Sequence, residues 1–272
     1  MVFPHRSVAG VATDVFSSPV PSKDNRLTSR PFAPAAPRAV VTTTLTRRYE
    51  IAWLDQSGNI EMASRTAPAI AEFEEAFSAF SRGTVIATTE GPVAIEDLVP
   101  GMQVITAEGR TETVTWLGAM TLFPSRAARQ TETTNMTRIT ADAFGMGRPM
   151  PDLLLGPHAR ILLRDPRCRA IVGSATAYAP ARKFIDGISI VEVRPVAPVT
   201  VHHLVLERQG SVRAAGMEVE SYHPGMAVRD RMDPLLAEQL LGLFPHMRSL
   251  SEFGQIAHPR MSALDVEAAL DR

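Results

Sequence analysis

Two serines and two histidines are the candidates for a nucleophile and a base in this chain. Ser78 and Ser81 lie on either side of Ala79, and His158 and His203 are histidines that could serve as bases. A serine hydroxyl attacks a carbonyl only when a neighbouring base activates it. Serines at a helix end or in a turn more often form local hydrogen bonds. We therefore favour structural roles for both serines and keep an oxygen nucleophile as the alternative.

The single cysteine, Cys168, lies between Arg167 and Arg169. Two nearby cations would lower the pKa of a thiol and favour the reactive thiolate. Pro166 and the charges predict a loop here, however, so we expect a surface cysteine without a catalytic role. One cysteine also excludes an intramolecular disulfide and a cysteine-based zinc site.

The histidines do not predict a metal site. His202 and His203 are adjacent, and neighbouring residues of a strand face opposite sides of a sheet, so at most one of them could join a site. There is no His-x-x-x-His pattern. We expect neither a metal nor a cofactor.

Bulk composition limits the classes of partner. The chain has 272 residues, 45% of them hydrophobic and 21% charged, with a net charge of -1. These values are ordinary for a globular protein and give no reason to expect nucleic acid. The sequence has no uninterrupted run of about 18 apolar residues, so we expect no membrane insertion. The first residues lack a signal-peptide pattern, so we expect a cytoplasmic protein, with export without a cleaved signal left open.

The N-terminal part of the chain predicts a tail followed by a hairpin and a helix. Residues 1–46 are rich in Pro, Ser, Thr, Ala and Arg without apolar periodicity, which predicts a disordered tail. Within 47–78, residues 49–54 and 60–63 flank a good turn sequence. From Pro68 we expect an amphipathic helix, because apolar residues recur at spacings of three and four: Ile70, Phe73, Phe77 and Phe80.

From Thr84 short strands alternate with Gly or Pro turns, which predicts an all-β domain. The expected strands are 84–88, 93–98, 103–106, 113–117, 160–163, 188–193, 199–206 and 212–215. Helices are expected to return in a C-terminal extension, residues 227–272. Asp233 before Pro234 predicts the start of one helix, and Ser262 with Asp265 the capping of another.

Three blocks of sequence, taken in order, resemble the bacterial Hint (Hedgehog/intein) family. The first runs from Phe80-Ser81-Arg82-Gly83-Thr84 through Ile95-Glu96-Asp97-Leu98 to Val104-Ile105-Thr106. The second is 152–163, and the third runs from His203 to Gly225. The resemblance covers about 79–226 and implies a compact, pseudo-two-fold, disc-shaped all-β domain.

The resemblance also implies a self-processing reaction, and it shows which catalytic residues of that reaction this sequence lacks. In the family a cysteine at the position of Ala79 attacks the preceding carbonyl, assisted by a histidine at the position of Ala159. A later histidine falls at Gln209, and no asparagine follows Asn135 to cyclise downstream. His158 stands one residue early, and on a strand that offset turns its ring to the other face, whereas in a turn the argument weakens.

The expected function is therefore that of a Hint-domain protein that has lost autoprocessing and acts as a binding or interaction scaffold for an unidentified protein partner. The alternative is an active, self-cleaving domain that uses Ser78 or Ser81 with His158 or His203. A conventional enzyme with a site beside the C-terminal helices is a third class, for which the sequence offers no catalytic set.

Overall fold

The computed structural model describes residues 45–124 and 134–270, which belong to one compact unit. The predicted disordered tail, 1–46, lies outside the described residues except for its last two. Of these, Thr46 begins the first strand.

The predicted hairpin is confirmed. β1 (Thr46–Leu54) pairs antiparallel with β2 (Ile60–Pro68). The turn is held by Asp55, whose carboxylate accepts hydrogen bonds of 2.8 Å from the backbone N–H groups of Ser57 and Asn59. The other edge of β1 pairs with β7 (Thr111–Leu122), so the hairpin extends the main sheet.

The predicted amphipathic helix is largely wrong. α1 (Ala71–Glu74) has four residues; Pro68 still belongs to β2, and Phe80 begins β3 (Phe80–Ser81). The backbone of Phe80 pairs with β9 and β13, which requires extended rather than helical backbone. Phe73, Phe77 and Phe80 are all fully buried, but in two different cores, so they do not form one helical stripe.

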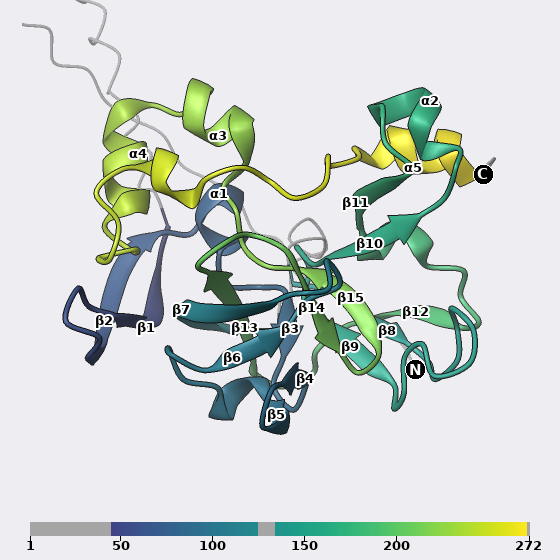
Figure 1. Cartoon of the computed structure of the whole chain (residues 1–272), viewed down its shortest axis with the longest axis horizontal. Helices are drawn as coiled ribbons and strands as arrows, with labels where there is room; N and C mark the ends of the chain where they lie inside the picture. The colour runs from purple at the N-terminus through teal and green to yellow at the C-terminus, as the bar shows by residue number, and fades with distance from the viewer. Residues whose placement is uncertain (1–44, 125–133, 271–272) are drawn as a thin grey trace, which may run out of the picture. The chain divides into compact units, whose positions relative to one another are not determined.

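The strands of the described chain join in a mostly antiparallel sheet with few helices beside it, which confirms the mainly β fold class (Figure 1). Its strands lie in the order β11-β10-β15-β14-β4-β6-β7-β13-β3-β9-β8-β12, with β1 and β2 joined at β7 and β5 at β4. The remaining strands are β4 (Val85–Thr88), β5 (Gly91–Ala94), β6 (Gln103–Ile105), β8 (Met136–Ile139), β9 (Leu153–Leu155), β10 (Arg160–Arg164), β11 (Thr176–Pro180), β12 (Ile190–Val193), β13 (Val199–Leu206), β14 (Ser211–Ala214) and β15 (Met217–Glu220).

Several local predictions need correction. The expected strand 93–98 is divided, because β5 ends at Ala94 and the 3-10 turn η1 (Ile95–Asp97) follows. The expected loop at Cys168 is instead the start of α2 (Cys168–Val172), and Cys168 is fully buried. Burial raises the pKa of its thiol, which opposes thiolate formation.

The C-terminal helices are α3 (Gly225–Arg231), α4 (Pro234–Leu241) and α5 (Ala263–Leu270). Both predicted caps are confirmed. Asp233 accepts from the N–H groups of Leu235 and Leu236. Ser262 and Asp265 bond reciprocally, each side chain accepting from the backbone N–H of the other. No helix in the described ranges is long and apolar enough to cross a membrane.

Two hydrophobic cores hold these elements together. An aliphatic core lies among the central strands and includes Ala79, Ile86, Leu155, Ala159, Leu204 and Val219. An aromatic core joins the hairpin, α1, β7 and α4 and includes Tyr49, Phe77, Trp116 and Phe244. Within it the Trp116 indole packs 4.6 Å from the Phe244 ring and donates to the carbonyl of Leu243 at 2.8 Å. Residues of the C-terminal helical region thus contribute to both cores.

Candidate functional site

The peptide bond between Ser78 and Ala79 is the centre of the candidate site. The carbonyl oxygen of Ser78 accepts a hydrogen bond of 3.2 Å from the backbone N–H of His158. The N–H of Ala79 donates to the carbonyl of His202 at 3.0 Å, and the carbonyl of Ala79 accepts from Gly156 at 2.8 Å. Backbone partners therefore hold this peptide on both sides.

Gly156 packs directly against this peptide. A Cβ atom at position 156 would stand 2.3 Å from the carbonyl oxygen of Ser78, closer than any real side chain approaches. The close approach of the two backbones therefore depends on glycine at position 156.

The two alanines predicted at the nucleophile and histidine positions belong to the same core. Ala79 is 0% exposed and Ala159 is 2% exposed, and both are members of the aliphatic core. Their methyl groups contribute apolar packing and no chemistry. The space around them is filled by hydrophobic side chains.

The two candidate serines have local partners. The hydroxyl of Ser78 donates to the carbonyl of Glu74 at 2.7 Å, four residues earlier. The hydroxyl of Ser81 donates to the carbonyl of Arg82 at 3.2 Å. In the described structure neither hydroxyl bonds to a histidine, so no base stands ready to activate either of them.

His158 lies in the turn between β9 and β10, so the argument from strand alternation does not apply to it. Its Nε2 atom is buried and has no hydrogen-bond partner among the described residues. Burial lowers the pKa of this imidazole, although the carboxylate of Glu75 opposes the shift. His158 contacts the Ser78 peptide through its backbone rather than its ring.

His203 is buried between the rings of Phe80 and Tyr222, each with its centroid 5.7 Å away. Burial lowers its pKa to about 3, so the ring is neutral near pH 7. Its Nδ1 accepts from the N–H of Leu204 at 3.1 Å. Its neighbour His202 faces the other side of β13, where it lines a groove.

Gln209 holds a C-terminal segment, residues 254–261, against the domain. Its Oε1 accepts from the N–H of Ala257 at 2.7 Å, and its Nε2 donates to the carbonyl of Ser221 at 3.2 Å. It therefore belongs to a polar network apart from the alanines, with its side-chain bonds made to fixed structural partners.

A charged cluster that sequence reasoning missed connects these parts. Glu75, Arg160, Glu220 and Arg260 each have a side chain less than a quarter exposed. Arg160 pairs with Glu75, and Arg260 pairs with Glu220 at 2.9 Å. Burial raises the pKa of Glu220 against the opposing charges of Arg260 and Arg160. Nothing in the sequence signals this cluster, because its members are separated by up to 185 positions (260 minus 75).

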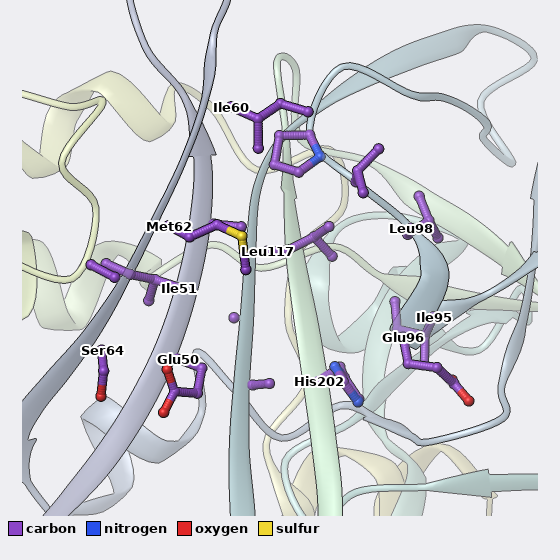
Figure 2. A pocket seen from close by; sticks show the side chains of 16 residues that line it. Glu50, Ile51, Ile60, Met62, Ser64, Ile95, Glu96, Leu98, Leu117 and His202 are labelled. Carbon is purple, nitrogen blue, oxygen red and sulfur yellow. The ribbon is translucent and has the colours of Figure 1, made fainter.

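A second surface, a groove of about 480 Å³, lies on the outer face of the hairpin and of β7 and β13 (Figure 2). Strand register sets Ser64, Glu50, Ala119 and His202 in one row across four strands. The next row contains Met62, Ala52 and Leu117. Ile95, Glu96 and Leu98 close the groove from the η1 side.

The groove meets the candidate site at His202. The carbonyl of His202 accepts from Ala79, while its side chain lines the groove. Its Nε2 has no hydrogen-bond partner among the described residues. Burial lowers the pKa of this imidazole, with Glu96 opposing. Sequence analysis missed the groove because it forms only when β1 pairs with β7.

In the described ranges, 45–124 and 134–270, no group of three or more His, Cys, Asp or Glu residues is placed to hold a metal ion.

The mainly β fold and the arrangement around Ser78 and Ala79 define an intein-like domain. The model of the Hint domain family matches residues 78–226, more than half of the chain, and the protein belongs to this family.

The chain is also similar to two solved structures. The solution structure of a bacterial intein-like domain from Clostridium thermocellum is 16% identical with a TM-score of 0.38, and the match covers 53% of this chain and 99% of that domain. The crystal structure of the MchDnaB-1 intein is 14% identical with a TM-score of 0.31, over 53% of this chain and 100% of the intein. No curated protein matches the chain significantly.

Proposed function

We propose that this Hint domain has lost autoprocessing and acts as a non-catalytic binding scaffold. The observation that carries the proposal is that the position next to the Ser78 carbonyl holds a buried alanine, Ala79, packed in one core with Ala159. A methyl group cannot attack a carbonyl. In the described structure neither candidate serine bonds to a histidine, so no base is hydrogen-bonded to another nucleophile.

The hydrogen bonds of the serines support this proposal over self-cleavage by Ser78 or Ser81. Each hydroxyl already donates to a nearby carbonyl. Attack by Ser78 would break its bond to Glu74 and require a base that reaches the buried hydroxyl. His203 is neutral near pH 7 but lies between two aromatic rings and bonds to neither serine.

The groove supports the binding part of the proposal. Its walls are mostly apolar, and polar groups gather at one end, where Glu50, Ser64 and His202 form a row. Ligand and partner sites commonly combine an apolar lining with a few fixed polar groups. We assign this groove to an unidentified protein partner.

Incubation of the purified chain with dithiothreitol or hydroxylamine tests the loss of autoprocessing. Hydroxylamine cleaves an ester formed by an N-to-O acyl shift, whereas dithiothreitol cleaves a thioester and serves as the control. We expect a single full-length band on a denaturing gel at all times. A pair of fragments broken near residues 77–81 would contradict the proposal and favour the serine alternative.

A further inference from the structure

The strand β2 is the longest open sheet edge in the part of the chain that the structure describes. It has nine residues and pairs only with β1. The edge strands β5 and β12 have four residues each, and β11 is partly covered by a bridge from Tyr178 to Arg260. Proteins usually shorten or cover such edges, because an open edge pairs with another chain.

The backbone polarity of β2 follows from the bonds at both ends of the hairpin. Asp55 donates to the carbonyl of Asn59 at 2.9 Å, and Ala69 donates to the carbonyl of Leu45 at 2.8 Å. Antiparallel pairs alternate between hydrogen-bonded and non-hydrogen-bonded, so odd-numbered residues of β2 bond to β1. The even-numbered residues direct their N–H and C=O groups outward: Ile60, Met62, Ser64 and Thr66.

Two large apolar side chains and two opposite charges are exposed on this strand. Met62 is 78% exposed and Ile60 is 47% exposed. Two opposite charges, Glu61 and Arg65, lie four residues apart on the same face of the strand, and both are exposed. Neither forms an ion pair in the described structure, whereas Glu50 on the neighbouring strand pairs with Arg48.

We propose that two copies of this chain pair antiparallel through β2, with Ala63 opposite Ala63 of the second copy. Outward-facing groups must bond to outward-facing groups, so even-numbered residues oppose even-numbered residues. Among the registers that satisfy this rule, centring on Ala63 sets Glu61 opposite Arg65 of the second copy and Arg65 opposite Glu61 of the second copy. If the pairing were centred one residue away, on Met62 or on Ser64, Glu61 and Arg65 of the two copies would no longer lie opposite one another.

This register suits both kinds of cross-strand contact. Met62 and Ser64 of the second copy form a hydrogen-bonded pair. Glu61 and Arg65 of the second copy form a non-hydrogen-bonded pair, in which side chains approach more closely. The two-fold symmetry makes every contact occur twice, as in an isologous dimer. Met62 also lines the groove, so the dimer brings two grooves beside one another.

The proposal does not depend on the loss of autoprocessing, because the free edge of β2 and its charges exist in either case. Light scattering of the full chain should give twice the 29.5 kDa of one chain at tens of micromolar. A monomer at that concentration would overturn the proposal, while the gel experiment above would be unaffected.

Charge reversal tests the register. Glu61→Lys and Arg65→Glu each set like charges opposite one another twice, and we expect each to raise the dissociation constant about tenfold or more. A mixture of the two variants restores both ion pairs in a heterodimer, so association should return to within about threefold of the original. Dimers that are insensitive to both reversals would overturn the proposal.

A backbone variant tests the edge independently. Ser64→Pro removes an outward N–H without touching a bond to β1, so the hairpin should persist and dimerisation should be lost. Circular dichroism checks that each variant is folded. Glu90→Lys, a charge reversal in the exposed turn between β4 and β5, is the matched control and should leave the dimer intact. Equal loss of dimer in the control would contradict an interface at β2.

Discussion

The backbone N–H of His158 lies 3.2 Å from the carbonyl oxygen of Ser78 and donates a hydrogen bond to it. This is the carbonyl that a nucleophile at position 79 would attack. The turn that carries His158 therefore still holds the peptide, although Ala79 offers nothing that can react with it. The backbone hydrogen bonds that hold the peptide therefore do not require a reactive side chain at position 79.

The close packing behind this peptide predicts a cost for any side chain at Gly156. In Gly156→Ala the new Cβ would stand 2.3 Å from the Ser78 carbonyl oxygen, which forces the two backbones apart. We expect a loss of about 2 kcal/mol in the free energy of unfolding, measured by urea denaturation. Gly242→Ala is the control, since a Cβ there meets nothing nearer than 3.3 Å. Equal effects of the two substitutions would contradict the close approach.

The pair formed by Arg260 and Glu220 predicts a pH-dependent effect. Arg260→Gln leaves the buried Glu220 without its nearest cation, and we expect a loss of about 3 kcal/mol near pH 7. The pKa of Glu220 is raised by burial and would rise further without Arg260. A carboxyl with a raised pKa stabilises the fold when protonated, so this stability is present at low pH and is lost as the pH rises.

The variant should therefore lose more stability at pH 7 than at pH 4, when each is compared with the original chain at the same pH. Unfolding in urea at both pH values measures this. Adding Glu220→Gln to Arg260→Gln should remove most of the difference. A pH-independent loss would contradict a role for the charge of Glu220.

Glu108 is expected to stabilise the fold with the opposite pH dependence to Glu220, so that its contribution is lost in acid. Burial alone would raise its pKa, but hydrogen bonds from His258 and from the N–H and hydroxyl of Ser211 outweigh it and lower the pKa to about 2. A carboxyl with a lowered pKa stabilises the fold above its ordinary value of 4.5, and this stability is lost as the pH falls toward 2.

The lowered pKa of Glu108 contributes at most about 3 kcal/mol to the free energy of unfolding. Glu108→Gln should weaken the fall in unfolding free energy between about pH 4.5 and 2, measured against the original chain. An unchanged profile in Glu108→Gln would count against the hydrogen bonds from His258 and Ser211.

The aromatic core predicts that the C-terminal helical region stabilises the whole domain. Phe244→Ala would remove a fully buried ring packed on Trp116, and we expect a loss of about 3–5 kcal/mol in a single unfolding transition. Leu235→Ala, at a 70% exposed position, should change stability by less than about 0.5 kcal/mol. Separate transitions for the C-terminal region and the sheet would contradict a shared core.

Features set by local sequence could be predicted. The turn at Asp55 and the caps at Asp233 and Ser262 depend on hydrogen bonds within a few residues, and all three are present. The prediction of a helix that includes Phe73 and Phe80 is wrong, because Phe80 pairs with β13 in extended conformation although the spacing of the apolar residues is typical of a helix. Short strands such as β9 and β15 are too brief for a periodic signal and are specified by their partners.

The candidate site was predictable only in part. Family motifs located Ala79, Ala159 and Gln209, and each has a defined place in the structure. The roles of Gly156, Glu75 and Arg260 depend on contacts between distant segments, which no spacing reveals. The division of the chain at residues 78/79 and 226/227 stays a prediction.

Intact mass spectrometry of the purified chain, kept in hydroxylamine over several days, tests the central claim most directly. Attack by Ser78 or Ser81 on the preceding carbonyl would release an N-terminal fragment, 1–77 or 1–80, that ends in a hydroxamate. The loss of autoprocessing predicts a single mass near 29.5 kDa that does not change with time. Either hydroxamate fragment, growing with time and abolished by the matching serine-to-alanine variant, would contradict it.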